Sequence, residues 1–288
     1  MPSVPRRWTP DAMAEFDITP LSPALGAEIR GVDFSSPMDA EIIADIRQAL
    51  LEHLVLVFRC GETSEDEQLR FAGHFGPTIG ARAALRMDGG DRRLMVISNV
   101  RENGEPIGAL PDGELMFHSD SVYLEKPLLG ATLYAEEIPS TGGNTLFANM
   151  YAAYEALPAE IRKEIAGLRA VNVFDYETQV KSGRFDRTTS PHATHPVVRT
   201  HPETGRKALY VNRLMTEEIV GLPADKSEEL LQTLFAHAEN RDHVYEHVWQ
   251  LDDLVMWDNR CTQHARTDFP ADERRLLRRV GIEGDVPV

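Results

Sequence analysis

Short apolar runs of strand length, each bounded by turn-forming residues, recur through this chain of 288 residues. Gly, Pro, Asn and Asp lie between most of them, so turns rather than helices connect most of the predicted strands. The runs are LVLVF, RLMVISNV, FHSDSVY, GATLYAEEIP, TLFAN, VYEHVWQL, DLVMWDN and RLLRRVGIEGD. This pattern predicts a mainly β fold, an antiparallel sandwich or barrel with peripheral helices, and argues against a doubly wound sheet.

Helical periodicity is confined to a few segments. AEIIADIRQALLEHL repeats apolar residues at three-to-four spacing and leads directly into the strand LVLVF. Ser64 is expected to cap a second helix, SEDEQLRFAGHFG. Three further helices are predicted at MYAAYEAL, AEIRKEIAGL and residues 227–239, and HPVVRTHPETGRKALYVN resembles a hairpin that turns at Glu203, Thr204 and Gly205.

The chain is interpreted as one domain over residues 15–286, preceded by a polar tail at residues 1–14. No internal repeat is visible in it. Residues 101–113 are rich in Gly, Pro and charge, and residues 171–194 are polar and lack a clear period. Long irregular segments of this kind usually border functional sites, so both are expected to form an insertion or lid.

The charge balance of the chain limits its partners. The 30 basic and 46 acidic residues give a net charge of -16, whose field repels nucleic-acid phosphates and anionic membrane surfaces. No apolar run approaches the length of about eighteen residues that spans a membrane, and the first residues lack the apolar segment of a signal peptide. The two cysteines, Cys60 and Cys261, fit a reducing cytoplasm. We therefore expect a cytoplasmic protein that binds neither nucleic acid nor membranes.

His118 and Asp120 stand two residues apart in FHSDSVY. On a strand both side chains leave the same face and can reach one ion. His264, in WDNRCTQHARTDF, is the third candidate and is expected where a strand ends at a turn. Two histidines and one carboxylate form a facial triad that suits iron(II) and leaves three positions open, but zinc accepts the same residue types. A His-X-Asp triplet alone is equally compatible with a hydrogen-bonded pair at a strand end.

Four arginines lie in RRLLRRV near the end of the predicted domain. Arg275 and Arg279 are four apart, so on a strand they share a face at a separation of roughly 13 Å, whereas Arg274 and Arg278 point the other way. Because Arg275 follows His264 closely, the inward pair is expected beside the metal candidates, where a guanidinium binds a carboxylate through two hydrogen bonds. The alternative is a solvated row of surface arginines in weak ion pairs.

Together these residues resemble the TauD/TfdA family of iron(II)/2-oxoglutarate-dependent dioxygenases, which includes taurine dioxygenase and (2,4-dichlorophenoxy)acetate dioxygenase. The resemblance covers nearly the whole chain and rests on LGAEIRGVDF, FHSD, PSTGGNTLFANMYAAYEALP, HPVVRTHPETGRKALYVN and WDNRCTQHARTDF through RRLLRRV. It implies a double-stranded β-helix (jelly-roll, cupin-like) core. It also implies that His118, Asp120 and His264 are the iron ligands.

The resemblance further implies a cosubstrate and a substrate class. Thr145 and Arg275 would hold the distal carboxylate of 2-oxoglutarate, and Arg279 would bind the anionic group of a small organic substrate. The implied reaction oxidises a substrate C–H bond with O2, most simply by hydroxylation, and releases succinate and CO2. Relatives often form dimers or tetramers, which implies a homo-oligomer.

The chain departs from taurine dioxygenase around the expected pocket. FGPTIGARAALRM stands where that enzyme has a histidine-rich segment, so a histidine contact to a sulfonate is missing and taurine is not the expected substrate. Ser121 and Tyr123 would line the pocket with hydroxyl groups and favour a more polar or larger substrate. Two other classes of protein stay open at this point: a zinc hydrolase on the same ligands and a non-catalytic jelly-roll binding protein.

Overall fold

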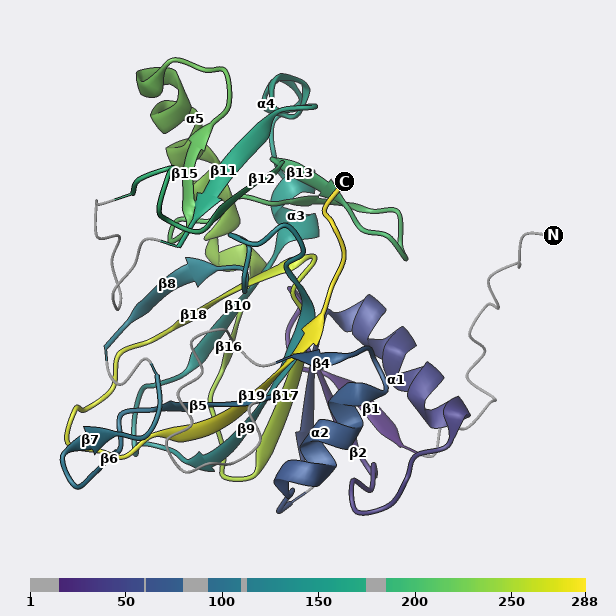
Figure 1. The fold of residues 1–288 in the computed structure, drawn as a ribbon. Coiled ribbons are helices and arrows are strands. Elements are labelled where there is room, and N and C mark those ends of the chain that lie inside the picture. The colour runs from purple at the N-terminus through teal and green to yellow at the C-terminus, as the bar shows by residue number, and fades with distance from the viewer. Residues whose placement is uncertain (1–15, 60, 80–92, 110–112, 175–184) are drawn as a thin grey trace.

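The computed structural model describes the chain over the ranges 16–59, 61–79, 93–109, 113–174 and 185–288. The predicted tail at residues 1–14 lies outside these ranges. Within them strands predominate and form two larger sheets and three small ones (Figure 1). The expectation of a mainly β protein with peripheral helices is therefore confirmed. None of the described helices is long and apolar enough to cross a membrane.

The larger sheet has eight strands in the order β1-β2-β3-β17-β9-β19-β4, and β5 also pairs with β19. Its pairs are antiparallel except β2 with β3, which run parallel on either side of a helix in the sequence. The strand bounds are β1 (Asp17–Pro20), β2 (Ala27–Arg30), β3 (Val55–Arg59), β4 (Thr78–Ile79), β5 (Leu94–Ser98), β9 (Leu128–Glu137), β17 (Asp253–Asp258) and β19 (Leu276–Glu283). Every residue of β17 is buried, so this strand is covered on both faces.

The smaller sheet has four antiparallel strands in the order β16-β10-β18-β8. Their bounds are β8 (Leu115–His118), β10 (Thr145–Asn149), β16 (Val244–His247) and β18 (Thr262–Arg266). Phe147 of this sheet and Trp257 of the larger one lie with their ring centroids 5.7 Å apart in one shared hydrophobic core. The two sheets therefore pack face to face, as in a sandwich.

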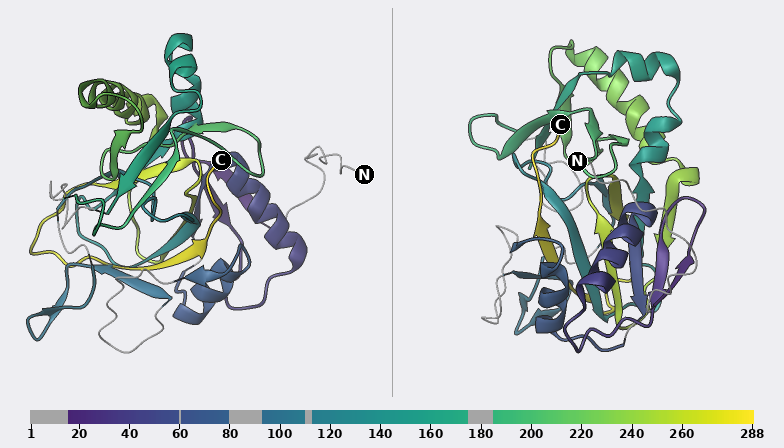
Figure 2. Two further views of the ribbon diagram at one scale, coloured as in Figure 1. Left: turned by 45° about the horizontal axis from the view of Figure 1, so that its top comes forward. Right: turned by 90° about the vertical axis from the view of Figure 1, so that its right-hand side faces the viewer.

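Helices α1 (Ala40–His53) and α2 (Glu65–Gly73) cover the outer face of the larger sheet (Figure 2). The run LVLVF explains how: Val55 and Val57 face the core between the sheets, while Leu56 and Phe58 face the helices. Because both faces of β3 are buried, its sequence is apolar throughout rather than alternating. Ser64 caps α2 in a full capping box, as predicted.

A third group of elements lies above the sandwich in Figure 1. It contains the three-stranded sheet β12-β11-β15 and the hairpin β13-β14, with helices around them. The bounds are β11 (Arg169–Val173), β12 (His192–Pro196), β13 (Val198–Thr200), β14 (Lys207–Leu209), β15 (Thr216–Ile219), α3 (Met150–Glu155), α4 (Ala159–Glu164), α5 (Ala224–Ala238) and the short 3-10 helix η1 (Arg241–His243). A separate hairpin is formed by β6 (Arg101–Glu102) and β7 (Glu105–Pro106).

Most of the predicted helices and strands are confirmed, with shifted ends. The hairpin turns at residues 201–206 as predicted, and the two ends of the segment predicted as an irregular insertion, residues 171–173 and 192–194, instead belong to the paired strands β11 and β12. The strand predicted for FHSDSVY is wrong beyond His118. Ser121 has a φ of 56°, so the chain turns there instead of extending.

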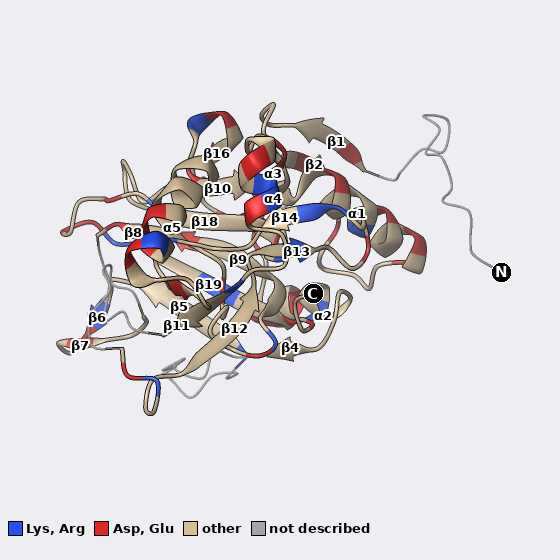
Figure 3. Ribbon diagram, turned by 90° about the horizontal axis from the view of Figure 1, so that it is seen from above, with Lys and Arg blue, Asp and Glu red and all other residues tan. Residues whose placement is uncertain are grey.

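The described helices carry much of the visible surface charge. Seen from above, acidic and basic residues are mixed on α1 and α5 (Figure 3). Helix α5, for example, buries Leu230, Leu231 and Leu234 against the protein and exposes charged residues on its other side. The apolar residues of this amphipathic pattern therefore face the core, and the charged residues face solvent.

Phe58 lies in a cluster of edge-to-face aromatic rings with Phe34 and Phe71 at centroid distances of 5.4 and 5.2 Å. We predict that Phe58→Ala lowers the free energy of unfolding by about 3–5 kcal/mol, because the space between β3 and α2 would be left unfilled. Urea unfolding at pH 7 measures this loss. Val220→Ala, at a side chain that is 47% exposed, is the control and should change stability by less than about 0.5 kcal/mol. A loss below about 1 kcal/mol for Phe58→Ala would contradict the packing described.

Candidate active site

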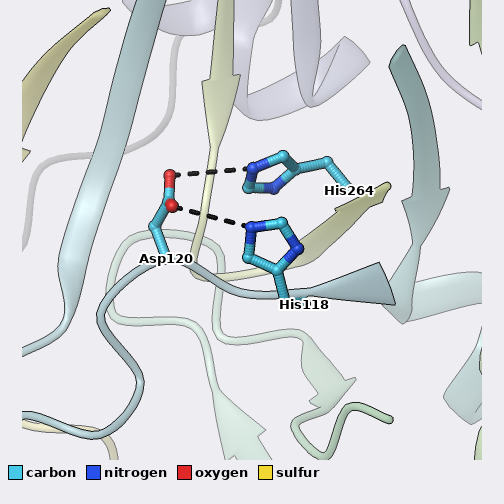
Figure 4. A group of neighbouring side chains, drawn as sticks. All are labelled: His118, Asp120 and His264. Carbon is cyan, nitrogen blue, oxygen red and sulfur yellow. Dashed lines mark ion pairs between the residues drawn. The ribbon is translucent and has the colours of Figure 1, made fainter. Parts of the chain in front are cut away.

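His118 and His264 lie directly opposite each other on neighbouring strands of the smaller sheet, β8 and β18. Their ring centroids are 4.2 Å apart (Figure 4). The expectation that His264 stands where a strand ends is wrong, because it occupies the middle of β18 and pairs with Phe147 on its other side. The backbone register of three strands therefore fixes both histidines.

Asp120 lies in the turn after β8 and points toward both imidazoles. Its Oδ1 is 3.9 Å from Nε2 of His118, and its Oδ2 is 3.9 Å from Nε2 of His264. The three residues come together as expected, but not by alternation along one strand, since β8 ends at His118. The two histidines are placed by the sheet and the carboxylate by the turn.

Burial and charge fix the protonation of these groups. Nδ1 of His118 lies 2.9 Å from the Met116 carbonyl, which only accepts hydrogen bonds, so the ring proton sits on Nδ1 and the Nε2 lone pair faces Asp120. Burial lowers the pKa of His118, and burial together with His118 lowers the pKa of His264 to about 3. Burial alone would raise the pKa of Asp120, but the Arg279 guanidinium and the two histidines together outweigh it and lower that pKa to about 2.

The donor set fits a divalent metal ion. Neutral imidazoles and an ionised carboxylate are the forms that bind metals, and the ligand atoms all lie within 4.8 Å of one another. The two distances of 3.9 Å from Asp120 to the imidazoles fit an ion held at roughly 2.1 Å from each ligand, which bridges atoms up to about 4.2 Å apart. Two histidines and one carboxylate leave coordination positions open for other molecules, as in the non-haem iron oxygenases.

A second group of possible metal ligands, His201, Asp258 and Cys261, is already satisfied within the protein. Nδ1 of His201 accepts from the backbone N–H groups of Glu203 and Thr204, so its Nε2 donates to Asp258. Burial opposes ionisation of Asp258, but the hydrogen bond from Arg260 holds its pKa well below the usual range. Burial raises the pKa of the Cys261 thiol. The ion pair of Asp258 with Arg260 thus has a structural role: through His201 it holds the backbone of the hairpin turn.

The three candidate ligands border a cavity of about 380 Å³. Most of its wall is apolar or aromatic, with the hydroxyl groups of Ser121 and Tyr123 near the turn that holds Asp120. The apolar lining comes from Met95, Ile97, Ala109, Leu115, Leu133, Phe174, Met215, Trp257 and Ala265. Such a cavity suits a small ligand with an apolar body and few polar groups.

Arg275, directly before β19, and Arg279, within it, both line this cavity, as the predicted alternation of this segment expects. On the other side, Arg274 pairs with Glu137 and Arg278 with Glu136. The guanidinium of Arg279 lies 2.5 Å from Oδ2 of Asp120. Arg279 thus pairs with a candidate metal ligand inside the cavity, whereas the outward arginines pair with glutamates on the other side of the sheet.

Arg275 is 2% exposed, and among the described residues it forms no ion pair with a carboxylate. Its Nε donates to the Gly143 carbonyl at 3.2 Å. Burial, together with the charge of Arg266, lowers the pKa of Arg275 to about 9. A buried cation with this environment is a strong site for an anion.

Thr145 lines the same part of the cavity. Its hydroxyl accepts a hydrogen bond of 3.0 Å from the indole N–H of Trp249. Because an indole only donates, the proton of the Thr145 hydroxyl is left for another acceptor. Thr145 and Arg275 therefore present donors to the same cavity.

Two residues at this end of the cavity were missed from the sequence. Arg266 lies two positions after His264 on β18, and the two share a face of the strand. Its guanidinium donates twice to the Gly113 carbonyl, at 3.0 and 2.7 Å. Strand alternation from His264 could have found Arg266, but no local pattern points from Trp249 to Thr145, which is 104 residues away.

A mainly β protein that gathers two histidines and a carboxylate beside an arginine-lined cavity has the arrangement of the non-haem iron oxygenases. The family model of the taurine catabolism dioxygenases, the TauD, TfdA family, matches residues 17–280. Pentalenolactone F synthase of Streptomyces avermitilis is 37% identical over 285 residues, which cover 92% of this chain and 92% of that protein.

Two further similarities point the same way. The (S)-phenoxypropionate/alpha-ketoglutarate-dioxygenase of Sphingobium herbicidovorans is 34% identical over 283 residues, which cover 94% of this chain and 96% of that protein. The crystal structure of AAD-2 in complex with Mn(II) and N-oxalylglycine matches with a TM-score of 0.78 and 29% identity, covering 94% of this chain and 98% of AAD-2.

The chain therefore belongs to the TauD/TfdA family of dioxygenases. It is a 2-oxoglutarate-dependent dioxygenase, an oxidoreductase whose cofactor is iron(II) and whose cosubstrates are 2-oxoglutarate and O2. The resemblance drawn from the sequence is confirmed. Membership of this family argues against both alternatives, the zinc hydrolase and the non-catalytic binding protein.

The buried cluster around Asp258 predicts how stability depends on pH. The pKa of Asp258 is lowered on folding, so its contribution to stability is present above the unfolded pKa of about 3.9 and is lost as the pH falls below it. We expect Asp258→Asn to lower the free energy of unfolding at pH 7 by about 3–5 kcal/mol, because the buried Arg260 would lose the closer of its two charged partners and keep only Glu203. The variant should also lose less stability than the wild type between about pH 5 and pH 3.

Urea unfolding at pH 7, 5 and 3 measures both effects. Asp272→Asn is the control, since Asp272 is exposed and should leave the pH profile unchanged. A variant and wild type that lose stability in parallel on acidification would show that Asp258 is not the group responsible.

Proposed function

We propose that this dioxygenase holds iron(II) through His118, Asp120 and His264, and 2-oxoglutarate through Thr145 and Arg275. The observation that carries the proposal is the buried guanidinium of Arg275, which has no carboxylate partner among the described residues and lies in the cavity beside the three candidate ligands. A desolvated charge is costly unless an opposite charge reaches it. The distal carboxylate of 2-oxoglutarate would supply that charge.

The groups around Arg275 support a dicarboxylate rather than a simple anion. Thr145 offers a hydroxyl proton, and Arg266 adds positive charge to the same end of the cavity. A carboxylate accepts one bond from Thr145 and further bonds from a guanidinium. With one end of the cosubstrate held there, its keto acid end would reach the open positions of the metal.

Arg279 is proposed to bind the anionic group of the substrate, with Ser121 and Tyr123 beside it. Its side chain is 11% exposed and next to Asp120, so an anion bound there would lie close to the metal. The apolar remainder of the lining suits an apolar organic body. A phenoxypropionate, named in the description of one relative, combines an aromatic ring with a carboxylate. We propose this general type of substrate, and not taurine.

The proposed reaction converts a substrate C–H bond, O2 and 2-oxoglutarate into a C–OH group, succinate and CO2. Iron(II), when bound, supplies the activation of dioxygen. The residues of the chain bind and orient the two organic molecules. The apolar wall excludes water from the space between them.

Several broader features are proposed with this function. The two packed sheets are proposed to form a double-stranded β-helix, within a single domain over residues 15–286. Residues 101–113 and 171–194 are proposed as lids, without the ends at 171–173 and 192–194 that pair in β11 and β12. Residues 110–112 and 175–184 lie outside the described ranges, and the adjoining Ala109 and Phe174 line the cavity. A homodimer or tetramer is also proposed, supported by exposed Val248 and Leu251 in the turn before β17. A cytoplasmic location is proposed on the low cysteine content.

The function is tested by succinate release from 2-oxoglutarate. We predict that the wild-type protein with iron(II) and O2 releases succinate when an aryloxy acid, sulfate ester, sulfonate or other small acid from a panel is its substrate, and that taurine is poor. His118→Ala should abolish release, since two ligands hold the metal much more weakly than three. Full activity in this variant would refute the ligand assignment. Release in a reaction without O2 would refute the oxygenase chemistry.

Arg275→Gln tests the cosubstrate site. We expect the KM for 2-oxoglutarate to rise about 100-fold, because the variant loses a buried bond between charges worth roughly 2–5 kcal/mol, while the KM for the organic substrate changes little. Steady-state kinetics with each reactant varied in turn measure the two constants. Arg274→Gln is the matched control, since Arg274 is exposed and paired with Glu137. An unchanged KM for 2-oxoglutarate in Arg275→Gln would rule out this site.

A further inference from the structure

The turn that carries Asp120 is held by one side chain from a distant part of the chain. Oδ1 of Asn259 accepts from the backbone N–H of Asp120 at 2.7 Å, and its Nδ2 donates to the Asp120 carbonyl at 3.1 Å. The same Nδ2 donates to the Leu128 carbonyl at 3.0 Å. Asn259 and Asp120 are 139 positions apart in the sequence. Asn259 is fully buried, so water does not compete for these bonds.

The chemistry of these contacts admits one orientation of the amide. A backbone N–H only donates and a carbonyl only accepts, so the oxygen of Asn259 must face the Asp120 N–H and the nitrogen must face the two carbonyls. The side chain thus bonds both polar groups of one peptide residue, as a neighbouring strand does in a ladder. The pairing of β8 with β18 stops at His118, two residues before Asp120, and the Asn259 side chain supplies the backbone hydrogen bonds of Asp120 in place of a strand partner.

The position of Asn259 is itself fixed by the larger sheet. It follows β17 directly, and its own N–H donates to the Leu129 carbonyl at 2.9 Å. The preceding residue, Asp258, is buried, and its carboxylate accepts hydrogen bonds from His201 and Arg260. Its backbone N–H donates to the Leu54 carbonyl. The Asn259 amide is therefore attached to a backbone segment that buried hydrogen bonds hold in place.

The turn needs such a support. Ser121, next to Asp120, adopts a φ of 56°, which L-residues other than Gly, Asn and Asp rarely take up. A backbone in this region persists only where its surroundings hold it. The hydrogen bonds from Asn259 are on the residue immediately before this strained position.

We propose that Asn259 is a positioning residue for the carboxylate ligand: it fixes the backbone of Asp120 so that the carboxylate meets the two imidazoles that the smaller sheet has placed. This inference rests on the proposed function in one respect, that a metal binds at these three residues. Asn259 does not touch the metal position and acts through Asp120 alone. Loss of its amide frees the turn and separates the carboxylate from the histidine pair.

The test is metal affinity, measured by titration calorimetry of the metal-free protein with Mn(II). Asn259→Ala should weaken Mn(II) binding about 10–100-fold, the usual effect of removing a group that orients a ligand. The absorption spectrum of the Co(II)-loaded variant should also differ from the wild type, because the carboxylate would leave its place. The matched control is Asn149→Ala. Asn149 also makes three hydrogen bonds to backbone groups, with Tyr151, Ala152 and Ala24, at the start of α3.

Comparison of the two variants separates positioning from general stability. Both are expected to lower the melting temperature of the metal-free protein, but only Asn259→Ala should lower Mn(II) affinity. Equal affinities in the two variants, or a Co(II) spectrum identical to the wild type in Asn259→Ala, would overturn the inference. A wild-type protein that binds no Mn(II) would instead overturn the proposed metal site.

Asn259→Asp covers the case in which the alanine variant does not fold. The aspartate has the size of asparagine and keeps the acceptor for the Asp120 N–H, but it turns an oxygen toward two carbonyls. Its added negative charge would by itself favour a cation. Weaker Mn(II) binding in this variant therefore reports the broken donor bonds, and equal or tighter binding would contradict the role assigned to Asn259.

Discussion

The antiparallel register between β8 and β18 is the constraint on which the candidate site depends. It places His118 opposite His264, and β10 holds β18 in turn by pairing Phe147 with His264. The ring of Trp257, from the larger sheet, lies 4.9 Å from the His264 ring. A slip of one residue in this register would turn each histidine to the other face of the sheet. The packing of the core thus sets the position of the two histidines among the proposed metal ligands, so the fold determines the geometry of the candidate site.

The second constraint is electrostatic. The chain as a whole is acidic, yet three arginines line one small cavity. Burial and the charge of Arg266 lower the pKa of Arg275, so holding its guanidinium charged there costs free energy in the protein alone. That cost is offset when a dianionic molecule enters. Because the cavity wall is mostly apolar, the interaction is screened less than at the surface, which favours small anions over the water they displace.

The sequence predicts the sheet strands and helices well because their patterns are local. LVLVF is apolar throughout since β3 is covered on both faces, and Ser64 caps α2 by contacts within three residues. The turn at Asp120 was missed for the opposite reason. FHSDSVY contains no glycine or proline that would indicate a turn, while Asn259, which holds the turn by hydrogen bonds, is far away in the sequence. Family resemblance selected three residues that do come together, and their role as metal ligands stays a prediction. Periodicity gave the wrong geometry for Asp120, and His264 was wrongly placed at a strand end.

The division between sheet and turn has a consequence for specificity. The histidines belong to strands whose register the core enforces, whereas Asp120 shares its turn with Ser121 and Tyr123, which line the cavity proposed to bind the substrate. A substitution that reshapes the cavity at either of these two residues also acts on the backbone of Asp120, the proposed carboxylate ligand. Leu133 on β9 and Met95 on β5 line the same cavity from the larger sheet, where a side chain can change without moving any of the three ligands. Substitutions at Leu133 or Met95 are therefore expected to change the substrate preference and leave metal binding intact. Substitutions at Ser121 or Tyr123 are expected to affect both.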